Sequence, residues 1–367
     1  MDSKYKVSAV KCNSYEPKKL HQALIDSLRN IDFNFKKSRV LIKPNILGPH
    51  TPEQALTTNP ILIEELCKIL KKFNAEIYIG ESAGLDTQRS LEISGIKKLS
   101  RYAKIINFDY SKTRVFDIGM KGEKILLPEI LFDMDLIINL PKLKTHVFTK
   151  VTLAVKNLYG CIPGKLKSNL HRIFPDSKSF SRLLVNLENK IKPQLNIIDG
   201  VIGIQGDGPG TSGELIKSEI ILASRNPYAL DIIASEIMGF KAGDIYTNKF
   251  SKIKKEDIDV LGNGKGLKLG FKKPRIHYSG LLAPLLAIFP KLKIDFDKNK
   301  CNQCLSCELK CPVNAIKIIP NHRCNYKSCI GCSCCIEICP KGAIYLKEHW
   351  AEKTVKRIYR YFKNHFK

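Results

Sequence analysis

Long apolar runs are missing from this sequence of 367 residues. The longest candidate, Leu281–Phe289, is interrupted by Pro284 and falls well short of the roughly 18 apolar residues that a membrane-spanning helix needs. The N-terminus also lacks the charged and then apolar segment that directs secretion. We therefore expect neither a membrane-spanning helix nor a secreted, disulfide-rich protein, and we predict a cytoplasmic location.

Acidic side chains are also scarce. The sequence has 35 Asp and Glu against 61 Lys and Arg, which gives a formal net charge of +26. Such a balance favours acidic partners, and we expect an anionic small molecule or conjugate and a redox partner protein such as an acidic ferredoxin or a flavodoxin. Nucleic acid is disfavoured, because the lysines are spread along the chain and no recognition-helix or aromatic RNA-binding pattern is present.

Cysteine, by contrast, is abundant near the C-terminus and follows a repeated pattern. Two runs, CNQCLSCELKCP from residue 301 and CIGCSCCIEICP from residue 329, both have the form C-x2-C-x2-C-x3-C-P. This spacing is typical of iron–sulfur proteins, because three closely spaced thiolates can surround one face of a cluster. A zinc ribbon would instead have two separated C-x2-C pairs. The repeat predicts two equivalent cluster-binding units.

These cysteine runs resemble the bacterial-type ferredoxin domain over about 45 residues, which implies a small α+β fold. In two-cluster ferredoxins, the fourth cysteine of each run binds the other cluster. We therefore predict two [4Fe-4S] clusters. The expected ligands of the first are Cys301, Cys304, Cys307 and Cys339, and those of the second are Cys329, Cys332, Cys335 and Cys311. Cys324 and Cys334 lie outside the repeat and are expected not to be ligands.

Strands alternate with helices upstream of residue 240, which predicts an α/β domain with a largely parallel sheet. Amphipathic helices are expected to open at Pro17 and after Asn59-Pro60, and another around Thr149–Leu158. The expected strands are Tyr5–Val10, Arg39–Ile42, Ala75–Ile79, Leu136–Asn139 and Leu195–Ile198.

Polar residues follow these strands, and ligands bind beyond the carboxyl ends of open parallel sheets. In an extended segment, Lys142, Lys144 and His146 would share one face, where two ammonium groups beside an imidazole could bind phosphate or carboxylate and lower the histidine pKa. We assign these three residues a catalytic role; a basic surface loop is the alternative. The expected substrate-binding residues are Lys43, Asn45, Glu81, Lys156, Asn157, Asp199, Gly208 and Gly210.

The stretch Gly208–Gly213 matches G-x-G-x-x-G, the dinucleotide-binding pattern. That pattern requires the glycines to open a helix, whereas Glu214–Ala223 is expected to be extended. We favour a loop whose backbone amides contact an anionic ligand, with an ordinary tight turn as the alternative.

Three stretches of the large domain resemble the domain of unknown function 362 family. They are Lys43-Pro44-Asn45, LPKLKTHVFTKVTLAVKNLYG from Leu140 and DGVIGIQGDGPGTSG from Asp199, and the resemblance covers roughly residues 38–240. It implies an α/β domain that serves cluster-linked chemistry, without indicating a substrate.

Four parts are predicted: an α/β domain with a basic pocket (1–240), an irregular linker or subdomain (241–296), a two-cluster ferredoxin domain (297–346) and a basic amphipathic helix (347–367). That last helix could pack on the protein or touch a membrane surface. The predicted function is an oxidoreductase in which electrons pass through the clusters to an anionic substrate. An accessory protein that carries electrons or clusters to a partner enzyme is the alternative, and purely structural clusters are a third hypothesis.

Overall fold

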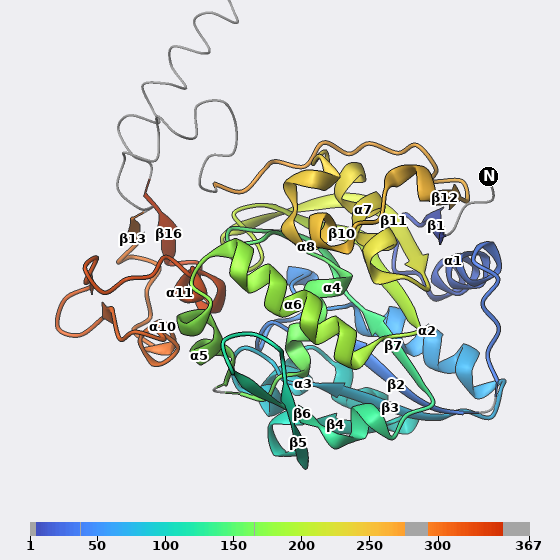
Figure 1. The fold of residues 1–367 in the computed structure, drawn as a ribbon, viewed down its shortest axis with the longest axis horizontal. Helices are drawn as coiled ribbons and strands as arrows, with labels where there is room; N and C mark the ends of the chain where they lie inside the picture. The colour runs from blue at the N-terminus through green and yellow to red at the C-terminus, as the bar shows by residue number, and fades with distance from the viewer. Residues whose placement is uncertain (1–4, 37, 165, 276–292, 348–367) are drawn as a thin grey trace, which may run out of the picture.

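The computed structural model describes residues 5–36, 38–164, 166–275 and 293–347. A large α/β domain is flanked on one side by a small C-terminal domain (Figure 1). Ten strands form the large sheet: β1 (Tyr5–Lys11), β2 (Arg39–Pro44), β3 (Glu76–Glu81), β4 (Lys104–Asn107), β7 (Leu136–Leu140), β8 (Lys142–His146), β9 (Lys150–Thr152), β10 (Leu195–Gly206), β11 (Gly213–Ser224) and β12 (Ile258–Leu261).

The sheet has the order β12-β1-β11-β10-β7-β2-β3-β4, with β8 and β9 branching from β10. Neighbouring strands from β10 to β4 are parallel, and β11 runs antiparallel to both of its neighbours. A separate hairpin is formed by β5 (Thr113–Asp117) and β6 (Lys124–Pro128). The predicted fold class, a mostly parallel α/β domain followed by a small domain, is confirmed.

Helices cover both faces of the sheet (Figure 1). Side chains alternate between the two faces along β2: Val40 and Ile42 belong to the core that includes α1 and α2, whereas Leu41 belongs to the core that includes α6. The helices of the large domain are α1 (Pro17–Asn30), α2 (Pro60–Lys71), α3 (Thr87–Ile93), α4 (Ala154–Asn157), α5 (Leu166–Ile173), α6 (Ser177–Ile191), α7 (Pro227–Ile237) and α8 (Tyr246–Ser251).

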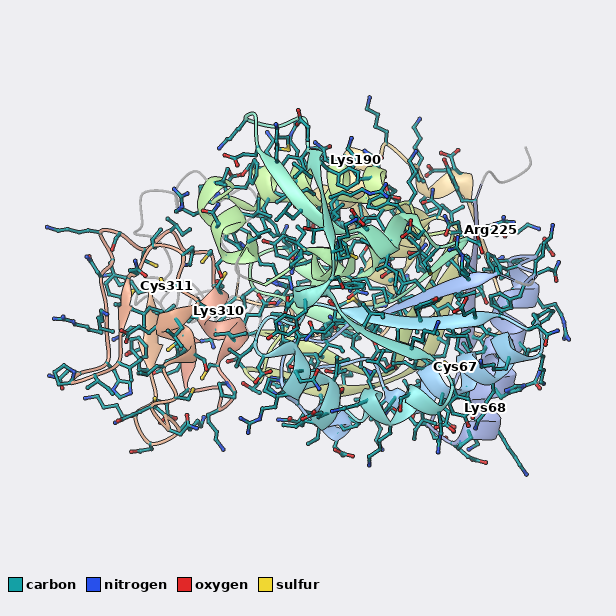
Figure 2. The ribbon with its side chains drawn as sticks, turned by 90° about the horizontal axis from the view of Figure 1, so that it is seen from below. Cys67, Lys68, Lys190, Arg225, Lys310 and Cys311 are labelled. Carbon is teal, nitrogen blue, oxygen red and sulfur yellow. The ribbon has the colours of Figure 1, made fainter. Side chains whose placement is uncertain are left out.

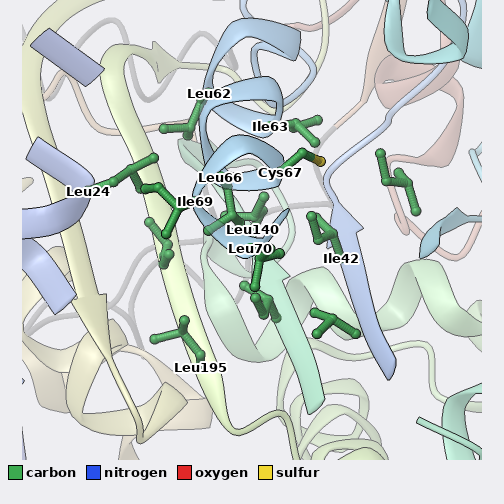
Figure 3. Close-up of a cluster of buried hydrophobic side chains, with 14 of the residues drawn as sticks. Leu24, Ile42, Leu62, Ile63, Leu66, Cys67, Ile69, Leu70, Leu140 and Leu195 are labelled. Atoms are coloured by element: carbon green, nitrogen blue, oxygen red, sulfur yellow. The ribbon is translucent and has the colours of Figure 1, made fainter. Parts of the chain in front are cut away.

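Helix α2 illustrates how local sequence determines where a helix begins and which face is buried. Asn59 accepts a hydrogen bond from the Ile61 amide at 2.9 Å and Pro60 occupies the first turn, as expected for a capped helix start. Its apolar stripe, including Leu66 and Leu70, packs in the same buried cluster as Ile42 of β2 (Figure 3). This packing of α2 on β2 and β3 fixes where the carboxyl ends of the two strands lie.

Two expectations differ from the structure. The helix predicted around Thr149–Leu158 begins later, because β9 first pairs with β8 in a hairpin whose turn has Lys150 at φ +71°. The segment 241–296, expected to be an irregular linker or subdomain, contains β12, which pairs with β1 and extends the large sheet. The predicted C-terminal helix lies outside the described residues, apart from Lys347.

The small domain contains two helices and two pairs of short strands: α10 (Ser306–Leu309), α11 (Cys334–Ile338), β13 (Ile294–Phe296) with β16 (Ile344–Leu346), and β14 (Ile316–Lys317) with β15 (Arg323–Cys324). Figure 2 shows Lys310 and Cys311 in this domain, at the opposite end of the molecule from Cys67. Within the described ranges, no helix is both long and apolar enough to cross a bilayer.

The two domains are docked through side-chain and backbone contacts. Val147, directly after β8, is buried in the core of the small domain. Thr211 donates to the Cys339 carbonyl at 2.8 Å, and Arg275 donates to the Leu346 carbonyl at 2.9 Å while forming an ion pair with Asp207. The small domain is therefore held against the ends of β8 and β10.

Candidate functional site

A partly open cavity lies between the two domains, beyond the carboxyl ends of β2 and β3, with a volume of about 100 Å³. We call it the interdomain pocket. Five of the predicted site residues line it: Asn45, Glu81, Lys144, Lys156 and Asn157. The small domain contributes Lys310 and three residues of α11, which are Cys334, Glu337 and Ile338. The pocket therefore has walls from both domains.

Lys43 and Glu81 form a buried ion pair at one side of this pocket. The Lys43 Nζ atom lies 2.6 Å from Glu81 Oε2, and Glu81 Oε1 accepts a hydrogen bond from the Ser82 amide at 2.9 Å. Burial raises the pKa of Glu81, while the positive charge of Lys43 opposes the shift. Gly160 packs directly on this pair, since a Cβ atom there would lie 2.0 Å from Glu81 Oε1. Lys43 thus neutralises Glu81 and is not available to a ligand.

Lys142 and Asp199 are placed differently from the prediction. They pair with each other at 2.8 Å, fully buried, because β8 and β10 are parallel with Lys142 opposite Asp199. Tyr15 accepts from Lys142 at 2.6 Å and donates to Asp199 at 2.8 Å, and the Asn59 amide also donates to Asp199. Neither Lys142 nor Asp199 lines the interdomain pocket. The pair holds β8 against α1 and α2 of the large domain.

Lys144 and Lys156 have a different environment. Lys144 is fully buried and donates to the Leu56 carbonyl at 3.0 Å, and Lys156 is 9% exposed with its Nζ atom 5.9 Å from the centre of the Tyr159 ring. Neither forms an ion pair with a carboxylate in the described part of the chain. Burial lowers the pKa of Lys144 to about 7 and also lowers that of Lys156. A bound anion would restore their charge and lower the cost of burying them.

Lys167 of α5 is a pocket residue that the sequence analysis missed. Its Nζ atom donates to the carbonyl and, at 2.8 Å, to the hydroxyl of Ser82, which in turn donates to Asp109 at 2.5 Å. Burial lowers the pKa of Lys167 to about 8, although the charges of Glu81 and Asp109 oppose the shift. The half-buried Asp109 also accepts from the Gly164 amide, so the loop before α5 is tied to the end of β3. No local pattern identifies Lys167, because a lysine on a short amphipathic helix usually faces solvent.

His146 is buried at the end of β8. Its Nδ1 atom accepts a hydrogen bond from the Phe148 amide at 2.9 Å, so the ring proton lies on Nε2, which is 3.6 Å from Glu337 Oε2. Burial lowers the pKa of His146 to about 4, and the nearby charge of Lys156 adds to this shift. The predicted like-charge effect is therefore present but secondary to burial. At neutral pH the ring is an uncharged donor that faces the small domain.

His171 lines the interdomain pocket from α5. Its ring stacks on Phe180 with centroids 4.3 Å apart, and Phe148 and Tyr159 meet it edge-on. Burial in this aromatic surrounding lowers its pKa to about 3. His171 is therefore a neutral wall residue at physiological pH.

The glycine-rich loop contacts the small domain. A Cβ atom at Gly210 would lie 2.7 Å from the Glu337 carbonyl, and one at Gly208 would lie 2.4 Å from the Thr145 carbonyl. The loop precedes β11, so it opens a strand and not a helix, in agreement with the rejection of a dinucleotide site. Pro209 is its one residue at the interdomain pocket, as far as the described residues show. Gly210 therefore permits close packing of the two domains, and Gly208 permits close packing of the loop on β8.

The cysteines of the two runs surround two further cavities. One is lined by Cys301, Cys304, Cys307 and Cys339, and the other by Cys311, Cys329, Cys332 and Cys335. The cysteines of each expected ligand set thus line one cavity, and Cys334, which was expected not to be a ligand, also lines the second. That these cysteines bind two clusters stays a prediction. Equivalent amides support equivalent sulfurs in the two repeats, since Ala315 donates to Cys311 Sγ and Ala343 to Cys339 Sγ, both at 3.2 Å.

These cavities fit an iron–sulfur cube better than a single ion. Among the described residues, no three His, Cys, Asp or Glu side chains converge as the ligands of one metal ion would. A cube of iron and sulfide is much larger than a single ion. Its four thiolate ligands therefore line a cavity and do not converge on one point. Cys334 lines both the cavity of the second cysteine set and the interdomain pocket, so only one short stretch of α11 separates the two.

Comparison with known proteins identifies both domains. Residues 40–236 match the family model described as Domain of unknown function (DUF362), and residues 294–317 match the 4Fe-4S binding domain. The chain therefore contains a 4Fe-4S binding domain. The thylakoid-associated protein sll1697 of Synechocystis is 30% identical over 247 residues, which cover 66% of this chain and 77% of that protein.

Two other similarities are more limited. The uncharacterized protein MJ0749 of Methanocaldococcus jannaschii is 39% identical over 83 residues, covering 21% of this chain and 32% of that protein. The lactate racemase apoprotein from Thermoanaerobacterium thermosaccharolyticum aligns with a TM-score of 0.38 at 15% identity, covering 61% of this chain and 54% of the racemase chain.

Proposed function

Because the chain belongs to the Domain of unknown function (DUF362) family and carries a 4Fe-4S binding domain, we propose that it is a cytoplasmic iron–sulfur oxidoreductase that reduces or oxidises an anionic small molecule in the interdomain pocket. In this proposal the chain holds two [4Fe-4S] clusters with the crossed cysteine sets. When bound, such clusters accept and donate single electrons. The large domain binds and orients the anion.

This proposal rests on helix α11, which lines both the interdomain pocket and the cavity of the second cysteine set. Cys335 of this helix lines the second cysteine cavity, whereas Glu337 and Ile338 line the interdomain pocket, and Cys334 lines both. A ligand in the pocket would thus lie one helix away from the bound cluster. The charge of the pocket also fits an anion, because Lys144 and Lys156 are buried without carboxylate partners among the described residues.

Within this site each residue has a proposed part in handling the ligand. Lys144 and Lys156 bind its negative charge, and the neutral His146 lies beside Glu337, with its Nε2 atom 3.6 Å from Glu337 Oε2. His171 and Tyr159 exclude water on the side of α5. Lys167, hydrogen-bonded to Ser82, can donate a proton to the ligand, because its pKa of about 8 is close to physiological pH.

Anaerobic single-turnover measurements test this function. The holoprotein is reduced, mixed with a panel of reducible anions (pyruvate, fumarate, nitrite and sulfite), and the return of the oxidised-cluster absorbance is followed. We expect at least one anion to reoxidise the wild-type protein and the Lys156→Met variant to do so at least tenfold more slowly. The exposed Lys190 in α6 provides the matched control, Lys190→Met. Equal rates in all three proteins would argue against the proposal.

The electrons need an external donor or acceptor, and we propose a redox partner protein that docks on the small domain. Leu309 of α10 is 79% exposed and is followed by Lys310, so this surface combines an apolar contact with positive charge. An acidic ferredoxin or flavodoxin has the complementary charge. The rate of electron transfer between this partner and the protein should fall steeply as the ionic strength rises. A rate that does not depend on salt would count against a charged partner.

A further inference from the structure

We propose that the ligand of the interdomain pocket carries two separate anionic groups, one bound by Lys144 and Lys156 and the other by Lys167, with a hydroxyl or similar donor between them. A small hydroxylated dicarboxylate has this chemistry, as does its phosphorylated counterpart. The proposal deepens the proposed function, because it concerns the same pocket. It can nevertheless be tested without any electron transfer.

The first argument is the balance of charge around the pocket. Four lysines line it, Lys144, Lys156, Lys167 and Lys310, against two carboxylates, Glu81 and Glu337. Glu81 is already neutralised by Lys43, which lies behind it. Glu337 and Asp109, the carboxylate near Lys167, therefore face four lysines, of which Lys144 has a pKa of about 7. Since unpaired buried charge is strongly unfavourable, a ligand with one negative charge would leave part of this excess uncompensated.

The second argument is that the lysines enter from different elements. Lys144 and Lys156, from β8 and α4, face each other, and Glu337 is the carboxylate near both. Lys167, from α5, is anchored instead to Ser82 and Ala83 after β3, where Glu81, Asp109, Lys43 and Lys310 surround it. Two positive centres on separate elements match two anionic groups on one ligand.

The third argument concerns two buried amide oxygens. Among the described residues, Asn45 Oδ1 and Asn157 Oδ1 have no hydrogen-bond donor, and both residues line the pocket. The orientation of Asn157 is fixed, because its amide nitrogen donates to Asn139 Oδ1 at 2.8 Å while Asn139 itself donates to Asn196 and to the Ala154 carbonyl. A buried acceptor without a donor is unfavourable. A ligand hydroxyl would supply that missing donor.

A set of four acids separates the contributions of charge and hydroxyl. Malate has two carboxylates and a hydroxyl, succinate has two carboxylates, 2-hydroxybutyrate has one carboxylate and a hydroxyl, and butyrate has one carboxylate. Phosphoglycolate tests whether a phosphate can replace one carboxylate. Binding to the oxidised holoprotein is measured by anaerobic titration calorimetry at low ionic strength.

We expect malate or phosphoglycolate to bind roughly 10- to 100-fold more tightly than 2-hydroxybutyrate, as one additional charged hydrogen-bonding group predicts. Malate should also bind several-fold more tightly than succinate. In the Lys167→Met variant the preference for two charges should disappear, while the weak binding of 2-hydroxybutyrate remains. The exposed control Lys190→Met should behave as the wild type.

Thermal unfolding without ligand shows whether these variants are still folded. Lys156→Met removes a buried charge but also the charge that most favours the ionised Glu337, so cooperative unfolding above the temperature of the binding assay is the required sign that this variant is folded. Binding of mono- and dicarboxylates within threefold of each other, or no binding of any acid at millimolar concentration, would overturn the proposal. Tight malate binding without any cluster reoxidation by anions would instead overturn the redox function and leave this site standing.

Discussion

Replacement of Gly160 by alanine tests the buried ion pair of Lys43 and Glu81. The new Cβ atom would lie 2.0 Å from Glu81 Oε1 and 2.7 Å from Lys43 Nζ, far inside van der Waals contact. The backbone cannot easily retreat, because the Gly160 carbonyl accepts a hydrogen bond from the Ser82 amide at 3.0 Å. The carboxylate must therefore move away from Lys43, whose side chain is completely buried.

The size of the effect follows from the burial of both charges. Separating a buried ion pair typically costs about 3–5 kcal/mol, because one or both charges are left without a partner in an apolar environment. For a domain of this size, each 1 kcal/mol lowers the melting temperature by about 2–4 °C. We therefore expect Gly160→Ala to lower the melting temperature of the holoprotein by roughly 6–20 °C.

Gly243 provides the matched control for this measurement. It lies in a 3-10 helix, η6 (Ala242–Asp244), as Gly160 lies in η5 (Leu158–Cys161), and a Cβ atom at Gly243 would meet nothing within 4 Å. Gly243→Ala should leave the melting temperature unchanged or raise it slightly. Circular dichroism under anaerobic conditions follows both variants. If Gly160→Ala and Gly243→Ala had the same melting temperature, the Lys43–Glu81 ion pair would not contribute to stability as argued.

Three other changes test the rest of the structure. Cys335→Ser should lower the iron content from about eight to about four atoms per chain, whereas the neighbouring Cys334→Ser should retain all of it, as measured by iron analysis and EPR; equal losses would contradict the assignment of Cys335, and not Cys334, as a ligand. The Asp231 carboxyl group accepts hydrogen bonds from the Ala154 and Val155 amides, and burial raises its pKa from 3.8 to about 7. Between pH 3.8 and about pH 7, Asp231 is therefore protonated in the native state and ionised in the unfolded chain. The free energy of unfolding should therefore fall as the pH rises from about 4 to about 7, by up to about 1.4 kcal/mol per pH unit, and Asp231→Asn should remove this slope in urea titrations and cost about 1–3 kcal/mol. Gly210→Ala should displace the Glu337 carbonyl and speed amide hydrogen exchange in α11; unchanged exchange would count against tight docking.

Local patterns in the sequence predict those features that depend on neighbours along the chain. The three closely spaced cysteines of each run line one cavity together, as their spacing predicts, whereas the place of the fourth cysteine was expected from the resemblance to two-cluster ferredoxins. Asn45 and Glu81 were found because polar residues directly after buried strands reach the same edge of a parallel sheet. The Asn59-Pro60 helix start is likewise a local signal.

Other features depend on distant parts of the chain and could not be predicted in this way. Lys142 and Lys144 have the same alternate spacing, but the register of β8 on β10 places Asp199 beside Lys142 alone, so only Lys144 faces the pocket. Glu337 comes from the other domain, and its place beside His146 depends on how the two domains dock. Lys167 is similarly specified by the ends of β3 and α5, which meet only in the folded chain.

The buried lysines also affect how this protein responds to heat. Lys43, Lys142 and Lys144 are fully buried, and removing such charges from water opposes folding at room temperature. This penalty shrinks on warming, because the hydration of ions becomes less favourable as temperature rises. The charged interior is therefore least costly near the upper end of the range in which the protein remains folded. Stability measured only at 25 °C would understate what the Lys43–Glu81 and Lys142–Asp199 ion pairs contribute at higher temperature.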